Sequence, residues 1–196
     1  ALGVLLAVIS GPGVLLFGIV GAFSSYFYTA PPLRLAARRG LGELAVGMNF
    51  GPLATAGTVY ALTSQFSVEA FLIGLPIGLL TTAILWINQF PDEEADRQAG
   101  KINLVVVLGK RRARLGYLLL VAGAFGLLLY WLISGLFPLG MLAVFISLPL
   151  AVYAARIAWG EYDQRSLVRA NSATIQLQLA AGLLMFGGIL FSAFWL

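Results

Sequence analysis

Apolar runs of about twenty residues fill most of this chain, and they constrain its fold more than any other feature. A transmembrane helix needs about 20 consecutive, mainly apolar residues. Six runs have that length, at residues 12–29, 42–63, 68–89, 114–134, 137–158 and 173–195, and residues 1–10 look like the end of a seventh. With 60% hydrophobic and only 10% charged residues, a soluble domain and a disordered chain are both excluded. The sequence predicts an all-α, polytopic transmembrane bundle with six full spans and a partial first one.

The positions of the basic residues predict how this bundle is oriented. All 12 fall in three connections: Arg34, Arg38 and Arg39; then Arg97, Lys101, Lys110, Arg111, Arg112 and Arg114; then Arg156, Arg165 and Arg169. The connections between them and the C-terminus carry none. Because Lys and Arg concentrate in cytoplasmic loops, we expect these connections in the cytoplasm and the C-terminus outside, in the lipid bilayer of a prokaryotic plasma membrane. The net charge of +4 therefore reflects topology, and no nucleic-acid partner is expected.

Glycine and proline positions indicate where helices pack closely and where they bend. Gly47-x3-Gly51 and Gly74-x3-Gly78 are small-residue pairs of the kind that lets two membrane helices approach each other. Pro76, Pro138 and Pro149 lie within or at the ends of runs, where a proline removes one backbone hydrogen bond. We expect close contacts at the glycine pairs and kinks or ends at the prolines.

The chemical signal lies around the second basic connection, which we expect to be a loop from Phe90 to Ala113. The chain has no His and no Cys, so the commonest general base and the thiolate ligands are missing. Asn88, Asp92 and Asp96 are four residues apart, and on a helix this spacing stacks them along one face. Oxygen ligands of this kind suit Mg²⁺, which one or two carboxylates often hold together with substrate phosphates. A solvated acidic cap on a cytoplasmic helix end is the alternative interpretation.

Two neighbours of this array affect what it can do. Pro91 has no N–H to donate to the carbonyl of Ile87, so the helix is expected to kink or break there. Gly100 and Lys101 follow Asp96 by four and five residues, close enough for the Lys101 ammonium to reach a phosphate held by the metal. The pattern thus predicts a site for a metal and a phosphate at the cytoplasmic mouth of the bundle.

Two blocks of sequence resemble the UbiA-type intramembrane prenyltransferases. The first is Tyr28-Thr29-Ala30-Pro31-Pro32-Leu33-Arg34-Leu35 followed by Arg38-Arg39-Gly40-Leu41-Gly42-Glu43, and the second is Asn88-x3-Asp92-x3-Asp96-x3-Gly100-Lys101 with Leu108-Gly109 behind it. In that family nine helices surround a cavity, and two Asp-rich motifs hold Mg²⁺ and the pyrophosphate of a prenyl donor. The second block resembles the second motif, while the first motif has no counterpart here. Asn103 stands where relatives often have Thr, and either side chain can hydrogen-bond a phosphate or the backbone.

The resemblance also implies how much of the family fold is present. Residues 1–10 correspond to the end of the family's third helix, so residues 1–196 form one membrane-embedded domain equivalent to the C-terminal two-thirds of the fold. Because only one of the two metal-binding motifs is present, we expect this chain by itself to be inactive.

The activity implied by the resemblance is transfer of a polyprenyl group from its diphosphate to an aromatic acceptor. The two blocks look most like the branch that uses 1,4-dihydroxy-2-naphthoate in menaquinone biosynthesis. Branches with 4-hydroxybenzoate, haem, chlorophyllide or glycerol-ether acceptors remain open. Outside the family, the alternatives are a membrane transporter or a scaffold. A transporter is disfavoured because polar or charged residues along a mid-span path are almost absent.

The resemblance assigns metal and leaving-group roles to the second block. Asp92 and Asp96, assisted by Asn88, would hold Mg²⁺ and neutralise the departing diphosphate. Lys101 would act as a catalytic cation on the same group. Arg97 is either a further substrate-binding cation or faces anionic lipid headgroups.

Further substrate contacts are implied outside that block. Tyr28 and Arg34 would lie at the rim of the diphosphate site, although Tyr28 could equally be an interfacial anchor. Asn49 would line the acceptor pocket. Three polar residues share one face of the last run, and for them interhelical hydrogen bonding is favoured over acceptor binding: Asn171, Thr174 and Gln178.

Overall fold

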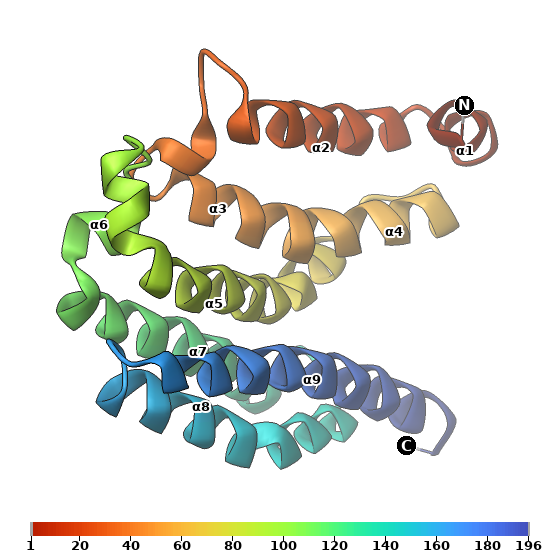
Figure 1. The fold of residues 1–196 in the computed structure, drawn as a ribbon. Coiled ribbons are helices and arrows are strands. Elements are labelled where there is room, and N and C mark those ends of the chain that lie inside the picture. Colours follow the sequence, from red (N-terminus) through yellow and green to blue (C-terminus); the bar gives the residue numbers. More distant parts are fainter. Residues whose placement is uncertain (1, 196) are drawn as a thin grey trace.

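A computed structural model describes residues 2–195, and every secondary-structure element in that part of the chain is helical. In chain order the elements are α1 (Leu2–Ser10), α2 (Gly13–Thr29), η1 (Leu35–Ala37), α3 (Leu41–Met48), η2 (Asn49–Leu53), α4 (Ala54–Thr63), α5 (Val68–Gln98), α6 (Leu104–Leu108), α7 (Lys110–Ile133), η3 (Leu139–Ser147), α8 (Leu148–Gly160), η4 (Arg165–Leu167) and α9 (Val168–Trp195). The long helices lie side by side in a stack (Figure 1). The predicted all-α polytopic bundle is confirmed.

Four helical segments of the described chain are long and apolar enough to cross a membrane: Val68–Gln98, Lys110–Ile133, Leu139–Gly160 and Arg165–Trp195. The other two predicted spans are less regular. Helix α2 is apolar but has only 17 residues. The run expected at 42–63 is helical from α3 to α4, but a π-helical turn, η2, interrupts it. Pro52 lies inside that turn, which suits a residue that has no N–H for the regular α-helical pattern.

At the basic end of the bundle the helices extend further than the apolar runs indicate. The expected loop from Phe90 to Ala113 is largely helical, because it contains the end of α5, all of α6 and the start of α7. Of the kink or break expected at Pro91, the break is wrong, since α5 continues to Gln98. Ile87 and Phe90, just before the proline, are buried in the core. Their packing holds the helix together although one backbone hydrogen bond is missing.

The connections separate by charge along the bundle. In Figure 1 the three basic connections, α2–α3, α5–α7 and α8–α9, lie at one end, and the α1–α2 and α4–α5 turns lie at the other with both chain ends. Helix α5 is central, since it contacts α3, η2, α7 and α9. The main core lies among α5, α7, α8 and α9, with Tyr117 and Leu177 fully buried. The predicted alternation of basic and uncharged connections thus corresponds to two ends of the molecule.

The glycine pairs pack against each other. A Cβ added to Gly51 would lie 2.6 Å from the Gly78 Cα, and one added to Gly74 would lie 2.7 Å from the Pro52 Cα. No side chain fits at these distances, so the backbones of α5 and the α3–η2 segment touch directly. This confirms the close contact predicted from the two glycine spacings. Of the other prolines, Pro76 lies inside α5, while Pro138 immediately precedes η3 and Pro149 is in the first turn of α8.

Candidate functional site

At the C-terminal end of α5, Lys101 forms an ion pair with Asp96. The backbone N–H of Lys101 donates to the carbonyl of Asp96 at 2.8 Å, and that of Gly100 donates to the carbonyl of Arg97 at 3.1 Å. Together with the positive φ of Gly100, +68°, these bonds form a Schellman motif, the turn that commonly ends a helix. The turn folds Lys101 back over α5, and its Nζ lies 3.0 Å from Asp96 Oδ2.

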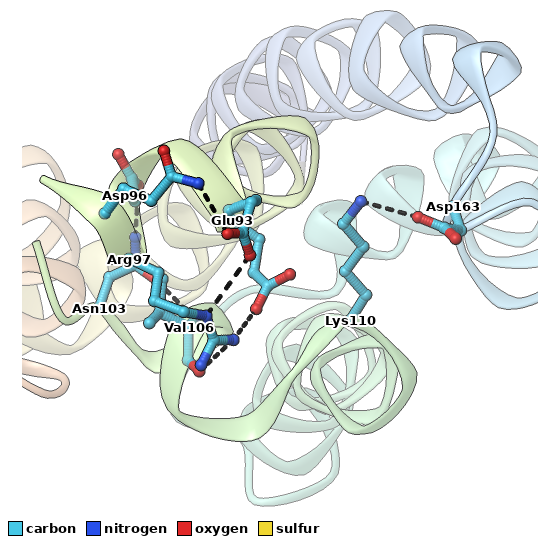
Figure 2. Close-up of polar contacts among 9 residues, drawn as sticks. Glu93, Asp96, Arg97, Asn103, Val106, Lys110 and Asp163 are labelled. Atoms are coloured by element: carbon cyan, nitrogen blue, oxygen red, sulfur yellow. Dashed lines mark hydrogen bonds and ion pairs between the residues drawn. The ribbon is translucent and has the colours of Figure 1, made fainter.

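A second polar contact, drawn in Figure 2, holds the same carboxylate oxygen of Asp96. The Asp96 side chain is mostly buried. The fully buried Asn103 donates from Nδ2 to Asp96 Oδ2 at 2.7 Å. Its Oδ1 accepts the backbone N–H of Val106 at 2.9 Å and so caps the first turn of α6. From the sequence, Asn103 could bond either a phosphate or the backbone. In this structure it bonds the backbone and Asp96.

A buried glutamate from α3 completes the N-terminus of α6. Glu43 Oε1 accepts the backbone N–H of Leu104 at 3.0 Å, and the residue is only 4% exposed. Its other oxygen, Oε2, is buried without a hydrogen-bond partner in the described part of the chain. The start of α6, and Asp96 with it, is therefore attached to α3 as well as to α5.

The other two members of the acidic array have different surroundings. Both Asn88 and Asp92 are exposed. Asn88 Oδ1 accepts a hydrogen bond from the Asn171 side chain on α9, whereas the structure gives Asp92 no hydrogen bond or ion pair within residues 2–195. The helix continues through all three positions, so the four-residue spacing stacks them along α5. Asp96 is tied to α6, and Asn88 to α9.

The remaining candidates lie apart from Asp96. Arg97 is paired with Glu93, lies 3.8 Å from Glu94 Oε2 and reaches the carbonyl of Val106 at 3.4 Å. Arg34 is exposed. Tyr28 and Asn49 line a separate cavity of about 320 Å³ between α2 and α3, where Asn49 Oδ1 accepts from Ser24 Oγ at 2.9 Å. The candidate residues therefore form two separate groups. Asp96 and Lys101 pair at the end of α5, and Tyr28 and Asn49 line the cavity beside α2.

A cavity of about 500 Å³ at this end lies between α5, the start of α7 and the α8–α9 connection. Asn88 and Pro91 form its α5 side. Lys110 Nζ donates to Asp163 Oδ1 at 2.7 Å (Figure 2), and the Arg114 guanidinium lies 3.9 Å from the centre of a Trp159 ring. These contacts fasten the α8–α9 connection to α7.

The polar residues of α9 bond to neighbouring helices. Asn171 bonds Asn88, Gln178 donates to Thr81 Oγ1 at 2.7 Å, and the Thr174 hydroxyl lies 2.7 Å from the Tyr117 hydroxyl. The interhelical hydrogen bonds expected for these three residues are therefore present, and Asn171 also lines the 500 Å³ cavity.

The sequence assigns no individual role to Glu43, Lys110 or Asp163. Glu43 carried a signal, because a lone carboxylate inside an apolar run is costly to bury and therefore needs a partner. No sequence signal points to the ion pair of Lys110 with Asp163, because the two residues are 53 positions apart and only the fold brings them together.

Comparison with known proteins identifies the family. Residues 1–180 match the UbiA prenyltransferase family. The chain belongs to this family. Together with the four apolar helices, this membership makes the chain an integral membrane protein. No solved structure gives a significant match.

Curated relatives share the family and carry related names. The chain is 28% identical to 1,4-dihydroxy-2-naphthoate octaprenyltransferase of Bacillus subtilis, over 98% of this chain and 62% of that protein. It is 34% identical to 2-carboxy-1,4-naphthoquinone phytyltransferase of Synechocystis, over 86% and 55%. It is 30% identical to 1,4-dihydroxy-2-naphthoate octaprenyltransferase of Mycobacterium tuberculosis, over 96% and 63%. The chain therefore spans less than two-thirds of the length of these relatives.

Proposed function

We propose that this chain belongs to an enzyme that transfers a polyprenyl group from its diphosphate to an aromatic acceptor in the membrane. The names of the relatives favour 1,4-dihydroxy-2-naphthoate as the acceptor, in menaquinone biosynthesis. The observation that carries the proposal is the cluster of Asp96, Lys101 and Asn103 at the basic end of α5, in a chain of the UbiA family. The positive-inside pattern supports a cytoplasmic position for this cluster in a prokaryotic plasma membrane.

The residues on α5 fit a Mg²⁺ ion that is shared with the substrate. Within residues 2–195 no group of three or more Asp and Glu side chains could hold a metal alone. The helix does offer Asp92, which is exposed, and Asp96 one turn later. Asp96 Oδ1 accepts one hydrogen bond, from Lys101, and so keeps a lone pair for a metal. Mg²⁺ is commonly held by one or two carboxylates together with substrate phosphates. We propose Asp92 and Asp96 as its ligands, with Asn88 assisting.

When bound, the ion would neutralise negative charge on the diphosphate and so help it to leave. The chain's own residues would do the rest. Lys101, already positioned by the turn at Gly100, supplies the cation nearest to Asp96. Asn103 keeps the Asp96 carboxylate in place. Arg97 forms ion pairs with Glu93 and Glu94 and reaches the carbonyl of Val106 on α6. We therefore assign it to holding the end of α5 against α6, in preference to binding substrate.

Tyr28, Arg34 and Asn49 remain proposals as substrate-binding residues. The cavity shared by Tyr28 and Asn49 supports a common role for these two. The exposure of Arg34 leaves its guanidinium accessible to a diphosphate at the basic end of the bundle.

The test compares carboxylate variants in the complete protein, supplied with Mg²⁺, a polyprenyl diphosphate and 1,4-dihydroxy-2-naphthoate. Prenylated product is measured by mass spectrometry. Asp92→Asn and Asp96→Asn are each expected to lower turnover by at least about 100-fold, with membrane insertion unchanged. Glu94→Gln is the matched control, because it removes one charge from an exposed carboxylate on the same stretch of helix. Near-normal turnover in both aspartate variants would contradict the metal assignment.

A further inference from the structure

The 500 Å³ cavity beside α5 has an apolar wall and a positively charged opening. Ile87, Pro91, Leu167 and Val168 provide apolar surface. The charged residues of its lining are Lys110, Asp163 and Arg165, so cations outnumber carboxylates. A cavity of this size, mainly apolar with a few polar groups, is typical of sites for small organic ligands.

The carboxylates near this opening are already paired with other cations. Asp163 accepts from Lys110 at 2.7 Å, and Glu161, two residues earlier, accepts from Arg169 at 2.8 Å. Hydrogen bonds from Ser166 and Arg169 lower the pKa of Glu161, so it is ionised and remains paired at neutral pH. Within residues 2–195 the structure gives the guanidinium of Arg165 no ion pair. Arg165 is therefore the cation at this opening that is free to bind an anion.

The cavity adjoins the proposed diphosphate site but does not include it. Asn88 and Pro91 line it, and they precede Asp92 on α5 by one turn or less, whereas Asp96 and Lys101 do not line it. A ligand in this cavity would thus lie next to the group that leaves, on the side of α5 that faces α9. The hydrogen bond between Asn88 and Asn171 joins the two helices beside it.

We propose that this cavity binds the aromatic acceptor, with the acceptor's carboxylate on Arg165 and its ring against Pro91 and Val168. This inference rests on the proposed function, because that function supplies both an acceptor and a neighbouring donor. An arginine can bind a carboxylate through two parallel hydrogen bonds. One unpaired guanidinium suits a single carboxylate, while the diphosphate has its own cation and carboxylates around Asp96.

The test measures binding without a prenyl donor and without Mg²⁺. The purified chain in detergent micelles is titrated with 1-hydroxy-2-naphthoate and with 1-naphthol, which has the same ring system but no carboxylate, and naphthyl fluorescence is recorded. We expect tighter binding of the carboxylated probe. Arg165→Gln should weaken its binding about tenfold and leave 1-naphthol unchanged, which is the loss expected for one charge-assisted contact. Arg165→Lys should restore part of the affinity because it keeps the charge but not the planar geometry.

Arg156→Gln is the matched control, since Arg156 is exposed on α8 and does not line the cavity. Equal weakening by Arg156→Gln and Arg165→Gln would overturn the proposal, because it would show a general surface-charge effect. Equal affinity for the two probes would overturn it as well. Displacement of the naphthoate by inorganic pyrophosphate that depends on Arg165 would assign this residue to the donor instead. None of these results depends on turnover, so failure of this inference and failure of the proposed function can be told apart.

Discussion

At the scale of single residues, Gly100 determines where Lys101 points. Its φ of +68° is a conformation that side chains with a Cβ adopt only with strain, at a cost of about 1–2 kcal/mol. A Cβ at this position would meet nothing within 4 Å, so the strain would come from the backbone alone.

We therefore predict that Gly100→Ala lowers the free energy of unfolding by about 1 kcal/mol and weakens the contact between Lys101 and Asp96. Thermal unfolding in detergent measures the first effect. Gly160→Ala is the control, because a Cβ there is equally free of contacts but the φ is not positive. That variant should be neutral or slightly stabilising. Equal behaviour of the two variants would show that the turn at Gly100 is not strained.

At the scale of secondary-structure elements, the short helix α6 depends on a residue from α3. Its first N–H groups have no partner within the helix, and Glu43 and Asn103 accept two of them. Loss of the Glu43 acceptor would leave the N–H of Leu104 without its partner, which costs about 1–3 kcal/mol when the group is buried.

Glu43→Ala is expected to destabilise the protein by that amount and to speed hydrogen exchange across α6. Mass spectrometry of exchanging peptides would detect the change. Glu43→Gln should behave more like the wild type, because it keeps an oxygen acceptor for Leu104. Glu69→Ala removes an exposed carboxylate from the first turn of α5 and should leave α6 unchanged. Unaltered exchange in Glu43→Ala would mean that α6 does not need this contact.

The contact between α5 and the α3–η2 segment gives a second prediction at this scale. Gly51→Ala places a methyl group 2.6 Å from the Gly78 Cα, and overpacking of this kind costs about 1–3 kcal/mol. Gly126→Ala is the control, because no atom lies within 4 Å of a Cβ on that α7 residue. Denaturant or thermal unfolding should separate the two variants. The glycine contact would be shown to be loose if both variants unfolded like the wild type.

What the sequence reveals at this scale depends on how local each contact is. The stacking of Asn88, Asp92 and Asp96 could be predicted because it needs only helical periodicity. The glycine pairs were visible for the same reason. The contact from Glu43 to Leu104 spans 61 residues and that from Lys110 to Asp163 spans 53, so neither follows from spacing. The end of α5 was misjudged because polar residues after Phe90 look like a loop, whereas the helix continues.

At the scale of the whole molecule, the distribution of charge matches the direction of the helices. Each chain crossing leads from a basic connection to one without Lys or Arg, and Figure 1 shows these two kinds of connection at opposite ends. A hydrophobic bundle could bury its apolar faces equally well in either orientation across a bilayer. On the positive-inside rule, we predict that the basic connections resolve this ambiguity by staying on the cytoplasmic side. This predicted orientation would put the Asp96 cluster and the proposed acceptor cavity on the same side of the membrane.

This orientation can be tested directly because the chain has no native cysteine. Single cysteines at Arg111, at the basic end of α7, and at Gln65, in the α4–α5 turn, are both at exposed positions. In intact cells a membrane-impermeant maleimide should label Gln65→Cys but not Arg111→Cys, and after permeabilisation it should label both. Arg112→Cys serves as a second reporter on the basic side, since it is also exposed. Labelling of Arg111→Cys in intact cells would place the Asp96 cluster outside and contradict the predicted orientation.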